Sequence, residues 1–580
     1  MKRFIYLIPL AFLLSLFFPH CAVIVAPTGG PKDTIPPVMV RSVPPVNATN
    51  FIGERIVITF DEFIRLDQIT QKMVLSPPQE QLPEFRVRGK SLDLKFYEAL
   101  LDSTTYTLYF ADAIVDNNEG NKLLNFEFAF STGPIIDSLR FIGKVIDAFT
   151  LEPKEGIFVM LYAEYGDSVP IVQRPRYVTK TNKEGHFFLS NLNYDNFKIF
   201  ALKDGNTNYK FDQITEEIAF SKTLIDTSML LWPSRAIAQK DSLYMLRLFL
   251  EENRAISLTD FSRKQRRRLS LGFTRKPEGD VKLRPINFEV DSAEVWFELG
   301  RSARGDTLHY WITNNELSKI DTLRMVATYL KTDSLMNLVE TSDTLRMFYL
   351  ERTQTTSSRR QRQEDEEVPK KQTMPVKNSL ATGGVIIPYD DLKLSFNIPL
   401  RSLDSTHISI MNLTDSTYLS SYDILKDSLD PLVYSIKNDW QSNISYKLNA
   451  LPGAFTNLDG VTNDTLIIRF KGADPEQFGS ISLSLTGVTH QIIAQVITDR
   501  GVVVDSKTTT SDGVVKFSYV RPGKYLLRFI VDENMNGRWD TGWYLQGIQP
   551  ERVLIYEDAN KNRDIQVRAN WEYELNYKIN

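Results

Sequence analysis

Short segments in which hydrophobic and polar residues alternate recur along most of the chain. Near the N-terminus they are Ile56–Phe60, Ser91–Phe96, Tyr106–Phe110 and Phe126–Phe130. Successive side chains of a strand point to opposite faces, so such alternation predicts strands with one buried face. Turn-forming residues separate the segments at short intervals, which is typical of two packed antiparallel sheets. The pattern predicts an all-β chain of tandem β-sandwiches.

The alternating pattern is repeated further along the chain. The matching landmarks are Ile56–Phe60 with Leu392–Phe396, Leu66-Asp67 with Leu403-Asp404, and the stretch from Tyr106 to Gly120 with that from Tyr446 to Gly460. The segment after each landmark set repeats as well. Without a gap, Glu184-Gly185, Leu192, Phe197 and Asp204 align with Asp512-Gly513, Val520, Tyr525 and Asp532. The chain is therefore expected to contain two copies of one two-domain unit.

A third type of region lies between the two copies. Its alternating or apolar runs are Leu246–Leu250, Val295–Leu299, Leu308–Ile312 and Leu345–Leu350, and they predict a central β domain. The following stretch, Glu351–Lys377, is polar and of low complexity, so it cannot bury enough apolar surface to order itself.

The expected division follows from these changes along the chain. It comprises a signal peptide (1–20), a tether (21–33), a first sandwich (34–134), a second sandwich (135–225), a central β domain (226–352), a flexible linker or loop (353–378), and the repeated sandwiches (379–474 and 475–580).

Two families resemble the repeated domains. Residues 34–134 contain IPPVMVRSVPPVNATNF, IVITFDEFIRLD, YTLYFADAIVDNNEGN and FEFAFSTG, and they resemble the bacterial Ig-like domain first described in S-layer proteins. The segment DGVVKFSYVRPGKYLLRFIVDENMNGRWD resembles transthyretin-like sandwiches related to carboxypeptidase regulatory-like domains. The first copy has Tyr194-Asp195 where the second has Pro522-Gly523, so it departs further from that pattern. The resemblance to Ig-like spacers and platforms implies architecture rather than chemistry.

The N-terminus has the pattern of an export signal. Lys2 and Arg3 precede an apolar segment, Phe4–Phe18, which is too short to be a stable membrane anchor. Cys21, the single cysteine of the chain, follows directly and is succeeded by a Pro/Gly-rich tether. This placement resembles a bacterial lipoprotein, in which the cysteine is acylated and becomes the mature N-terminus. The alternative is an isolated thiol in a signal peptide that is cleaved elsewhere.

Net charge argues against general electrostatic recruitment. The chain has 68 Lys and Arg against 72 Asp and Glu, a net charge of -4, so it offers no overall basic field to nucleic acid or an anionic bilayer. The most basic segment, Arg263–Arg268, could contact lipopolysaccharide phosphates or an acidic partner, or it could form a solvated face.

Known catalytic motifs are not found in the sequence. The five histidines, His20, His186, His309, His407 and His490, are scattered and lack paired zinc-ligand spacing. No nucleophile elbow, phosphate-binding loop or dinucleotide fingerprint occurs. We therefore expect no enzymatic activity, although the abundant Asp and Glu leave a glycosidase pair open.

Two loops share the pattern D-x-N-x-N-x-x-x-D. Their polar residues are Asp204, Asn206, Asn208 and Asp212 in the first loop and Asp532, Asn534, Asn536 and Asp540 in the second. Side-chain oxygens at alternate positions of a tight turn suit Ca²⁺, the one cofactor that the sequence suggests. The spacing resembles the start of EF-hand and dockerin loops, but the carboxylate expected at position 12 is replaced by Thr215 and Trp543. The site would therefore need backbone carbonyls, water or a more distant acid such as Glu216. The alternative is Asx-turn hydrogen bonding to the backbone.

Asp followed by Ser or Thr and then an apolar residue recurs in the second half of the chain. This triplet resembles the O-glycosylation sequon of exported Bacteroidota proteins, and the candidate acceptors are Thr307, Thr322, Ser334, Thr344, Ser428 and Thr465. The same residues are also expected wherever a turn leads into a strand.

Taken together, the sequence predicts a non-catalytic outer-membrane lipoprotein, a scaffold or protein-binding module whose partners are a lipid anchor and other envelope proteins, and not nucleic acid. Periplasmic and cell-surface orientations both fit. One alternative is an accessory subunit of an outer-membrane β-barrel complex. A second alternative is a glycan-binding or glycan-active surface protein, which exposed tryptophans near a cleft would favour.

Lipidation of Cys21 is directly testable. The mature protein should begin at Cys21 and carry acyl chains, and Cys21→Ala should move it from the membrane to the soluble fraction, because stable anchoring needs more than one acyl signal. Intact-mass analysis and membrane fractionation measure this. An unmodified N-terminus at another residue would contradict the prediction.

Overall fold

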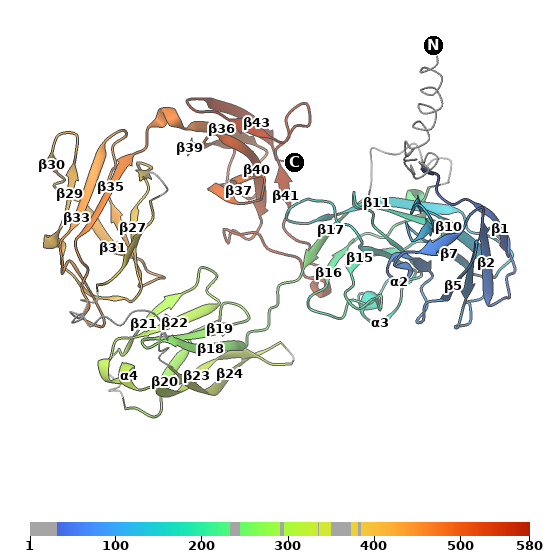
Figure 1. Cartoon of the computed structure of the whole chain (residues 1–580), viewed down its shortest axis with the longest axis horizontal. Helices are drawn as coiled ribbons and strands as arrows, with labels where there is room; N and C mark the ends of the chain where they lie inside the picture. Colours follow the sequence, from blue (N-terminus) through green and yellow to red (C-terminus); the bar gives the residue numbers. More distant parts are fainter. Residues whose placement is uncertain are drawn as a thin grey trace, which may run out of the picture. The chain divides into compact units, whose positions relative to one another are not determined.

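The computed structural model describes residues 32–231, 244–289, 295–334, 336–349, 373–380 and 384–579. The predicted signal peptide, Cys21 and most of the predicted linker lie outside these ranges. Strands dominate the regular structure, which confirms the all-β prediction (Figure 1). The chain forms two compact units, one built mainly from residues up to 248 and the other mainly from residues 249 onward.

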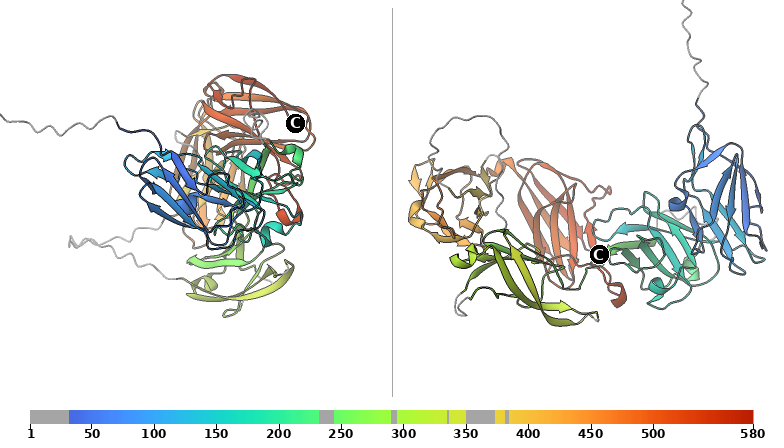
Figure 2. Two further views of the ribbon diagram at one scale, coloured as in Figure 1. Left: turned by 90° about the vertical axis from the view of Figure 1, so that its right-hand side faces the viewer. Right: turned by 60° about the horizontal axis from the view of Figure 1, so that its bottom comes forward.

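The first domain is a β-sandwich, coloured blue in Figure 2. One sheet has the order β1 (Met39–Val43), β2 (Arg55–Phe60), β6 (Ser91–Lys95), β5 (Glu84–Arg88). The facing sheet has the order β10 (Glu127–Ser131), β7 (Thr105–Tyr109), β4 (Val74–Ser76), and a small sheet joins β3 (Ile64–Leu66), β8 (Ile114–Asp116) and β9 (Lys122–Leu123). A single helical turn, α2 (Ile69–Lys72), connects β3 to β4. The predicted alternation holds on β2, where Ile56, Ile58 and Phe60 enter the core.

The second Ig-like domain repeats the order of the equivalent strands, with two more strands in its facing sheet and one fewer in its small sheet. Its first sheet runs β25 (Val376–Asn378), β27 (Leu392–Phe396), β32 (Val433–Lys437), β31 (Asp423–Lys426). Its facing sheet runs β26 (Val385–Ile386), β35 (Leu466–Gly472), β33 (Ser445–Ala450), β29 (Ile408–Asn412), β30 (Thr417–Tyr418), and β28 (Leu400–Leu403) pairs with β34 (Phe455–Asn457). The predicted linker ends earlier than residue 378, because β25 belongs to this domain and Met374 is buried in its core.

A buried tyrosine occupies the same place in both Ig-like domains. The Tyr106 hydroxyl accepts a hydrogen bond from the backbone N–H of Leu101 (2.8 Å), and the Tyr446 hydroxyl accepts one from Gln441, again five residues upstream (3.0 Å). Tyr106 stacks on Phe130 with ring centroids 5.4 Å apart, and Tyr446 stacks on Phe470 at 5.5 Å. The repeat seen in the sequence therefore extends to individual contacts.

The domain after the first Ig-like sandwich contains one seven-stranded sheet. Its order is β13 (Tyr177–Lys180), β12 (Phe158–Tyr162), β15 (Lys198–Lys203), β16 (Glu217–Phe220), β17 (Tyr244–Leu250), β11 (Leu139–Asp147), β14 (His186–Leu192). The helical turn α3 (Val169–Val172) lies between β12 and β13. The predicted boundary at residue 225 is wrong by one strand. Leu246 and Leu248 of β17 are buried in this core, whereas their alternation predicted only a strand and not its sheet.

The second copy of this domain, near the C-terminus, divides the equivalent strands between two sheets. One runs β38 (Val503–Thr509), β37 (Gln491–Thr498), β40 (Gly523–Asp532), β41 (Val553–Ile555), with β42 (Ile565–Val567) also paired to β40. The other runs β39 (Gly513–Val520), β36 (Gly479–Thr486), β43 (Glu572–Lys578). The first and last strands, β36 and β43, pair in parallel from Ser480 opposite Glu572 to Thr486 opposite Lys578.

The central domain is also a two-sheet structure. One sheet runs β18 (Leu258–Gln265), β19 (Arg268–Phe273), β22 (Thr307–Ile312), β21 (Phe297–Arg301). The other runs β20 (Lys282–Pro285), β23 (Thr322–Thr332), β24 (Leu338–Phe348), and the short helix α4 (Asn315–Lys319) connects β22 to β23. Leu269 and Leu271 of β19 share one core with Leu323 and Met325 of β23.

The tyrosine hydrogen bonds should contribute to domain stability. Tyr106→Phe or Tyr446→Phe leaves a backbone N–H unpaired, which costs about 1–3 kcal/mol. Hydrogen exchange by mass spectrometry should then show exchange about 5- to 150-fold faster in the core strands of the altered domain alone. Tyr418→Phe is the control, because Tyr418 is 68% exposed. Equal protection in all three variants would contradict this role.

Candidate functional site

The two D-x-N-x-N-x-x-x-D loops occupy equivalent positions. Asp204 directly follows β15, and Asp532 is the last residue of the equivalent strand β40. Each loop leaves the core sheet and turns sharply, so its first aspartate is held by the strand and its other polar residues line the turn.

Backbone N–H groups surround the first aspartate of the first loop. The Asp204 carboxylate accepts hydrogen bonds from the N–H groups of Asn206 (3.1 Å), Thr207 (2.6 Å) and Tyr209 (2.7 Å). Thr207 and Tyr209 have φ values of 58° and 62°, so the backbone twice enters the left-handed region. A carboxylate that binds several N–H groups compensates for this unfavourable backbone.

The second loop repeats this geometry with a buried aspartate. Asp532 is fully buried, and its carboxylate accepts hydrogen bonds from the N–H groups of Asn536 (3.1 Å) and Gly537 (2.8 Å) and from the Gln491 side-chain amide (2.8 Å). Met535 and Gly537 have φ values of 59° and 79°. Glycine adopts the second of these without strain, which the tyrosine of the first copy cannot do.

The asparagines of each loop bind its last aspartate. In the first loop the side-chain amides of Asn206 (3.3 Å) and Asn208 (2.6 Å) donate to the Asp212 carboxylate. In the second loop those of Asn534 and Asn536 both donate to one oxygen of Asp540. The four residues singled out in each loop are therefore brought together.

A buried glutamate completes each loop. The Glu216 carboxylate accepts hydrogen bonds from the N–H groups of Gly205 (3.2 Å) and Asp212 (3.1 Å). The Glu551 carboxylate accepts them from the equivalent residues, Glu533 and Asp540, both at 3.0 Å. Burial raises the pKa of the Glu551 carboxyl. Sequence reasoning missed Glu551, because it lies 19 positions after the first aspartate whereas Glu216 lies 12 positions after it.

Asx-turn hydrogen bonding accounts for the observed conformation of both loops. Across the part of the chain that the structure describes, no group of three or more His, Cys, Asp or Glu side chains could hold a metal ion. A Ca²⁺ ion would have to use the asparagine oxygens as well, and in the first loop those of Asn206 and Asn208 already accept backbone N–H groups (3.1 and 2.7 Å). Calcium binding stays a prediction.

The candidate glycosylation acceptors differ in exposure. Ser334, Thr344, Ser428 and Thr465 are exposed, whereas Thr307 and Thr322 are half-buried at the first positions of β22 and β23. The Thr307 hydroxyl also donates to the Asp306 carboxylate (3.2 Å). The positions of Thr307 and Thr322 fit the turn-to-strand interpretation, and the sequon interpretation stays a prediction for all six acceptors.

The basic segment Arg263–Arg268 is not a uniform surface patch. Arg263 is 4% exposed, and its guanidinium donates to the backbone carbonyls of Arg266, Ser318 and Ile320. Burial lowers the pKa of Arg263 to about 10. Arg267 is also buried, at 6% exposure. Two of the cations in this segment are therefore buried and bind other groups of the protein, which composition alone could not show.

The described histidines lie in four different domains. His186 is in β14, His309 in β22, His407 beside β29 and His490 before β37. The His309 imidazole lies 2.9 Å from the Ser270 hydroxyl on the adjacent strand, and burial lowers its pKa. Because each of these four histidines lies in a different domain, no two of them are available to one metal ion within a domain.

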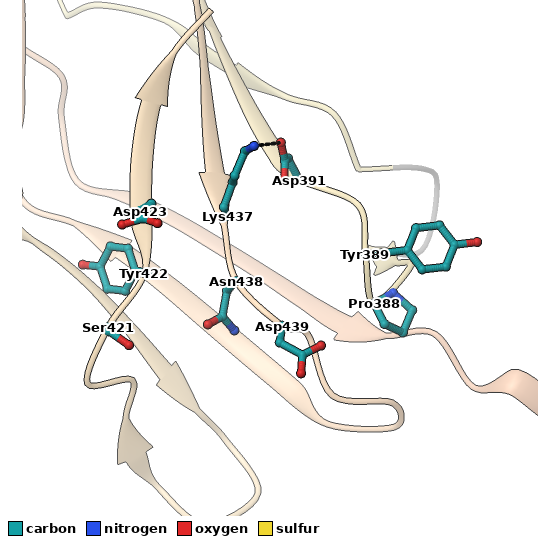
Figure 3. A pocket seen from close by; sticks show the side chains of 9 residues that line it. All are labelled: Pro388, Tyr389, Asp391, Ser421, Tyr422, Asp423, Lys437, Asn438 and Asp439. Carbon is teal, nitrogen blue, oxygen red and sulfur yellow. Dashed lines mark ion pairs between the residues drawn. The ribbon is translucent and has the colours of Figure 1, made fainter. Parts of the chain in front are cut away.

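A polar depression opens on the second Ig-like domain (Figure 3). It has a volume of about 420 Å³ and is lined by Pro388, Tyr389, Asp391, Ser421, Tyr422, Asp423, Lys437, Asn438 and Asp439. Lys437 lies 3.9 Å from the Asp391 carboxylate, so one of the three carboxylates that line the depression is partly neutralised.

Comparison with known proteins identifies one domain. Residues 33–132 match the family model described as bacterial Ig-like domain. This match confirms the resemblance proposed for the first sandwich, and such domains are typically non-catalytic. No curated protein matches the chain. Among the described residues, no helix is long and apolar enough to cross a bilayer.

Solved structures similar to this chain include surface layer and Ig proteins. Domains 1–6 of the surface layer protein SbsC are 10% identical, with 92% of this chain and 68% of that chain covered and a TM-score of 0.14. Titin domains A168–A170 are 11% identical, covering 48% of this chain and 94% of that chain, with a TM-score of 0.14. Escherichia coli alpha-2-macroglobulin domains MG0-NIE-MG1 are 9% identical, covering 34% and 96%, with a TM-score of 0.15. TM-scores this low support no argument about domain arrangement.

Calcium and Asx-turn stabilisation predict different responses. If the loops bind calcium, chelation should lower the melting temperature, and millimolar calcium should restore it, as expected for a weak site of about 10⁻⁴–10⁻³ M. Asp532→Ala should lower the melting temperature in either case, because it removes the acceptor for three hydrogen bonds. Only calcium binding predicts that, in this variant, chelator no longer lowers the melting temperature through the second loop. Identical melting curves with calcium and with chelator would leave the Asx-turn interpretation alone.

Proposed function

We propose that this chain is a non-catalytic outer-membrane lipoprotein that serves as a scaffold or protein-binding module. The Ig-like match supports the non-catalytic part, and the export pattern with Cys21 supports the anchor. The observation that carries the scaffold proposal is that neighbouring domains within each compact unit are joined by buried polar contacts. A scaffold needs such joints, because they fix the direction in which a surface is presented.

In the second unit, a buried arginine joins the central domain to the second Ig-like domain. The Arg267 guanidinium forms an ion pair with Asp459 and donates to the Ile312 carbonyl (3.0 Å) and the Asn315 side chain (2.8 Å). From the other side, the Arg401 guanidinium donates to the Leu458 carbonyl (2.5 Å) and reaches the Asn315 side chain at 3.5 Å. Asn315 therefore accepts from an arginine of each domain.

The same two domains also meet through a backbone hydrogen bond and an ion pair. The N–H of Arg301 donates to the Leu429 carbonyl (2.8 Å), and Lys426 pairs with Glu298 (2.8 Å). A Cβ at Gly300 would lie 2.9 Å from Cδ of Pro431, so glycine allows this close approach. Contacts on two sides of the joint resist bending in more than one direction.

In the first unit, the Ig-like domain contacts the domain that follows it. The buried Val178 N–H donates to the Ser76 hydroxyl (3.1 Å), and the Asn191 amide donates to the Thr107 hydroxyl (2.8 Å). The Ser190 hydroxyl donates to the Glu127 carboxylate (3.0 Å), whose pKa is raised by burial. Each acceptor lies on the Ig-like side and each donor on the other, so the two surfaces are complementary.

Partner capture tests the proposal. The full-length protein, cross-linked in cells and purified from detergent-solubilised membranes, should recover defined envelope proteins. Arg267→Ala should reduce that recovery several-fold, because loss of its charged hydrogen bonds weakens the joint by about 2 kcal/mol. Arg266→Ala is the matched control, since Arg266 pairs with Asp321 within the central domain. Recovery of no specific protein by the wild type would contradict a protein-binding role. Equal recovery by both variants would show that partner binding does not depend on this joint.

A further inference from the structure

The two transthyretin-like copies close differently along one edge. In the first copy, β16 pairs with β17, which joins all seven strands into one sheet. In the second copy, the equivalent strands β41 and β43 lie in separate sheets. Strand β42 pairs with β40 there, where the first copy has an isolated bridge between Phe197 and Ile225. The edge that is hydrogen-bonded between β16 and β17 in the first copy is therefore open in the second, between β43 on one side and β41 with β42 on the other.

Tyrosine side chains replace the missing strand pairing. The Tyr573 hydroxyl donates to the Gln566 carbonyl of β42 (2.7 Å) and accepts from the Arg568 N–H (3.1 Å). The Tyr577 hydroxyl of β43 reaches the Ile555 carbonyl of β41 at 3.5 Å. Because a tyrosine ring is longer than a backbone hydrogen bond, these contacts hold the strands apart and fix the rings in place.

A pocket of about 310 Å³ occupies this opening. That volume lies at the lower end of the range for small-ligand sites, about 300–1,000 Å³. Its most exposed aromatic residue is Trp571, whose side chain is 53% exposed, and the Tyr573 ring lies 6.1 Å from it and is tilted by 30°. The Arg568 guanidinium lies 4.9 Å from the Trp571 ring. The pocket thus presents an aromatic platform in which the Arg568 cation lies over one face of the indole ring.

The rest of the wall combines polar side chains with the apolar residues Ile565 and Leu575 and with Tyr556. Asp558, Asn562 and Gln566 line the pocket together with Asp564. Asp564 is paired with Lys524 (2.8 Å), so the Arg568 cation and the Asp558 carboxylate balance each other. The wall is therefore close to neutral, with amide and carboxylate groups next to an aromatic platform.

We infer that this pocket binds a neutral sugar residue of a glycan. A pyranose has an apolar face of C–H groups that fits an exposed indole ring, and hydroxyl groups that amides and carboxylates hydrogen-bond. A charged ligand would disturb the balance between Arg568 and Asp558, and a purely apolar ligand would leave the polar wall without partners. This site goes beyond the scaffold role and does not depend on it.

Affinity electrophoresis and calorimetry of the full-length protein test the inference. The probes are maltohexaose, cellohexaose, mannohexaose and chitohexaose, with the corresponding polysaccharides in the gel. At least one should bind, and Trp571→Ala should weaken that binding tenfold or more without changing the melting temperature. Gln566→Ala, which leaves the carbonyl bound by Tyr573 in place, should weaken it several-fold and provides a second variant if Trp571→Ala does not fold.

Tyr194→Ala is the matched control. Tyr194 is an exposed aromatic residue of the first copy, 76% exposed, so its removal should leave binding unchanged. Absence of binding to every probe would overturn the inference. Equal loss with Tyr194→Ala, or unchanged binding in Trp571→Ala, would place any interaction elsewhere and would also overturn it.

Discussion

An apolar core packed between sheet faces stabilises each domain that the structure describes, because a single cysteine allows no intramolecular disulfide. In the Ig-like domains the packing centres on a tyrosine stacked on a phenylalanine, Tyr106 on Phe130 and Tyr446 on Phe470. Each tyrosine also uses its hydroxyl to satisfy a backbone N–H five residues upstream. One side chain thus packs against its partner on the neighbouring strand of the same sheet and also holds the loop that enters its own strand.

Outside these shared cores, the two copies differ where their strands and loops contact other parts of the chain. The second Ig-like domain carries Asp459 and Arg401, which bind groups of the central domain. In the second transthyretin-like copy, β41 and β43 do not pair, which leaves open an edge that is closed in the first copy. Duplication therefore preserved the cores, and the two copies diverged at joints and edges, where a substitution costs less stability.

The sequence predicted the fold well where local alternation decides it. Ile56–Phe60 and Leu392–Phe396 are strands with the expected buried positions, because a period of two is fixed by strand geometry. It failed for β17, since alternation does not tell which sheet a strand joins. It also missed Glu551, whose position depends on the length of the connection to β41, and the burial of Arg263 and Arg267, because charge in a sequence says nothing about carbonyls that fold around it.

The parallel pairing of β36 with β43 has a mechanical consequence. The domain begins at one end of this pair and finishes at the opposite end, with seven matched positions between them. A load applied between the two ends of the domain pulls the strands along each other, so the hydrogen bonds across the pair share the force instead of breaking one after another. Such a domain can transmit tension along the chain before it yields.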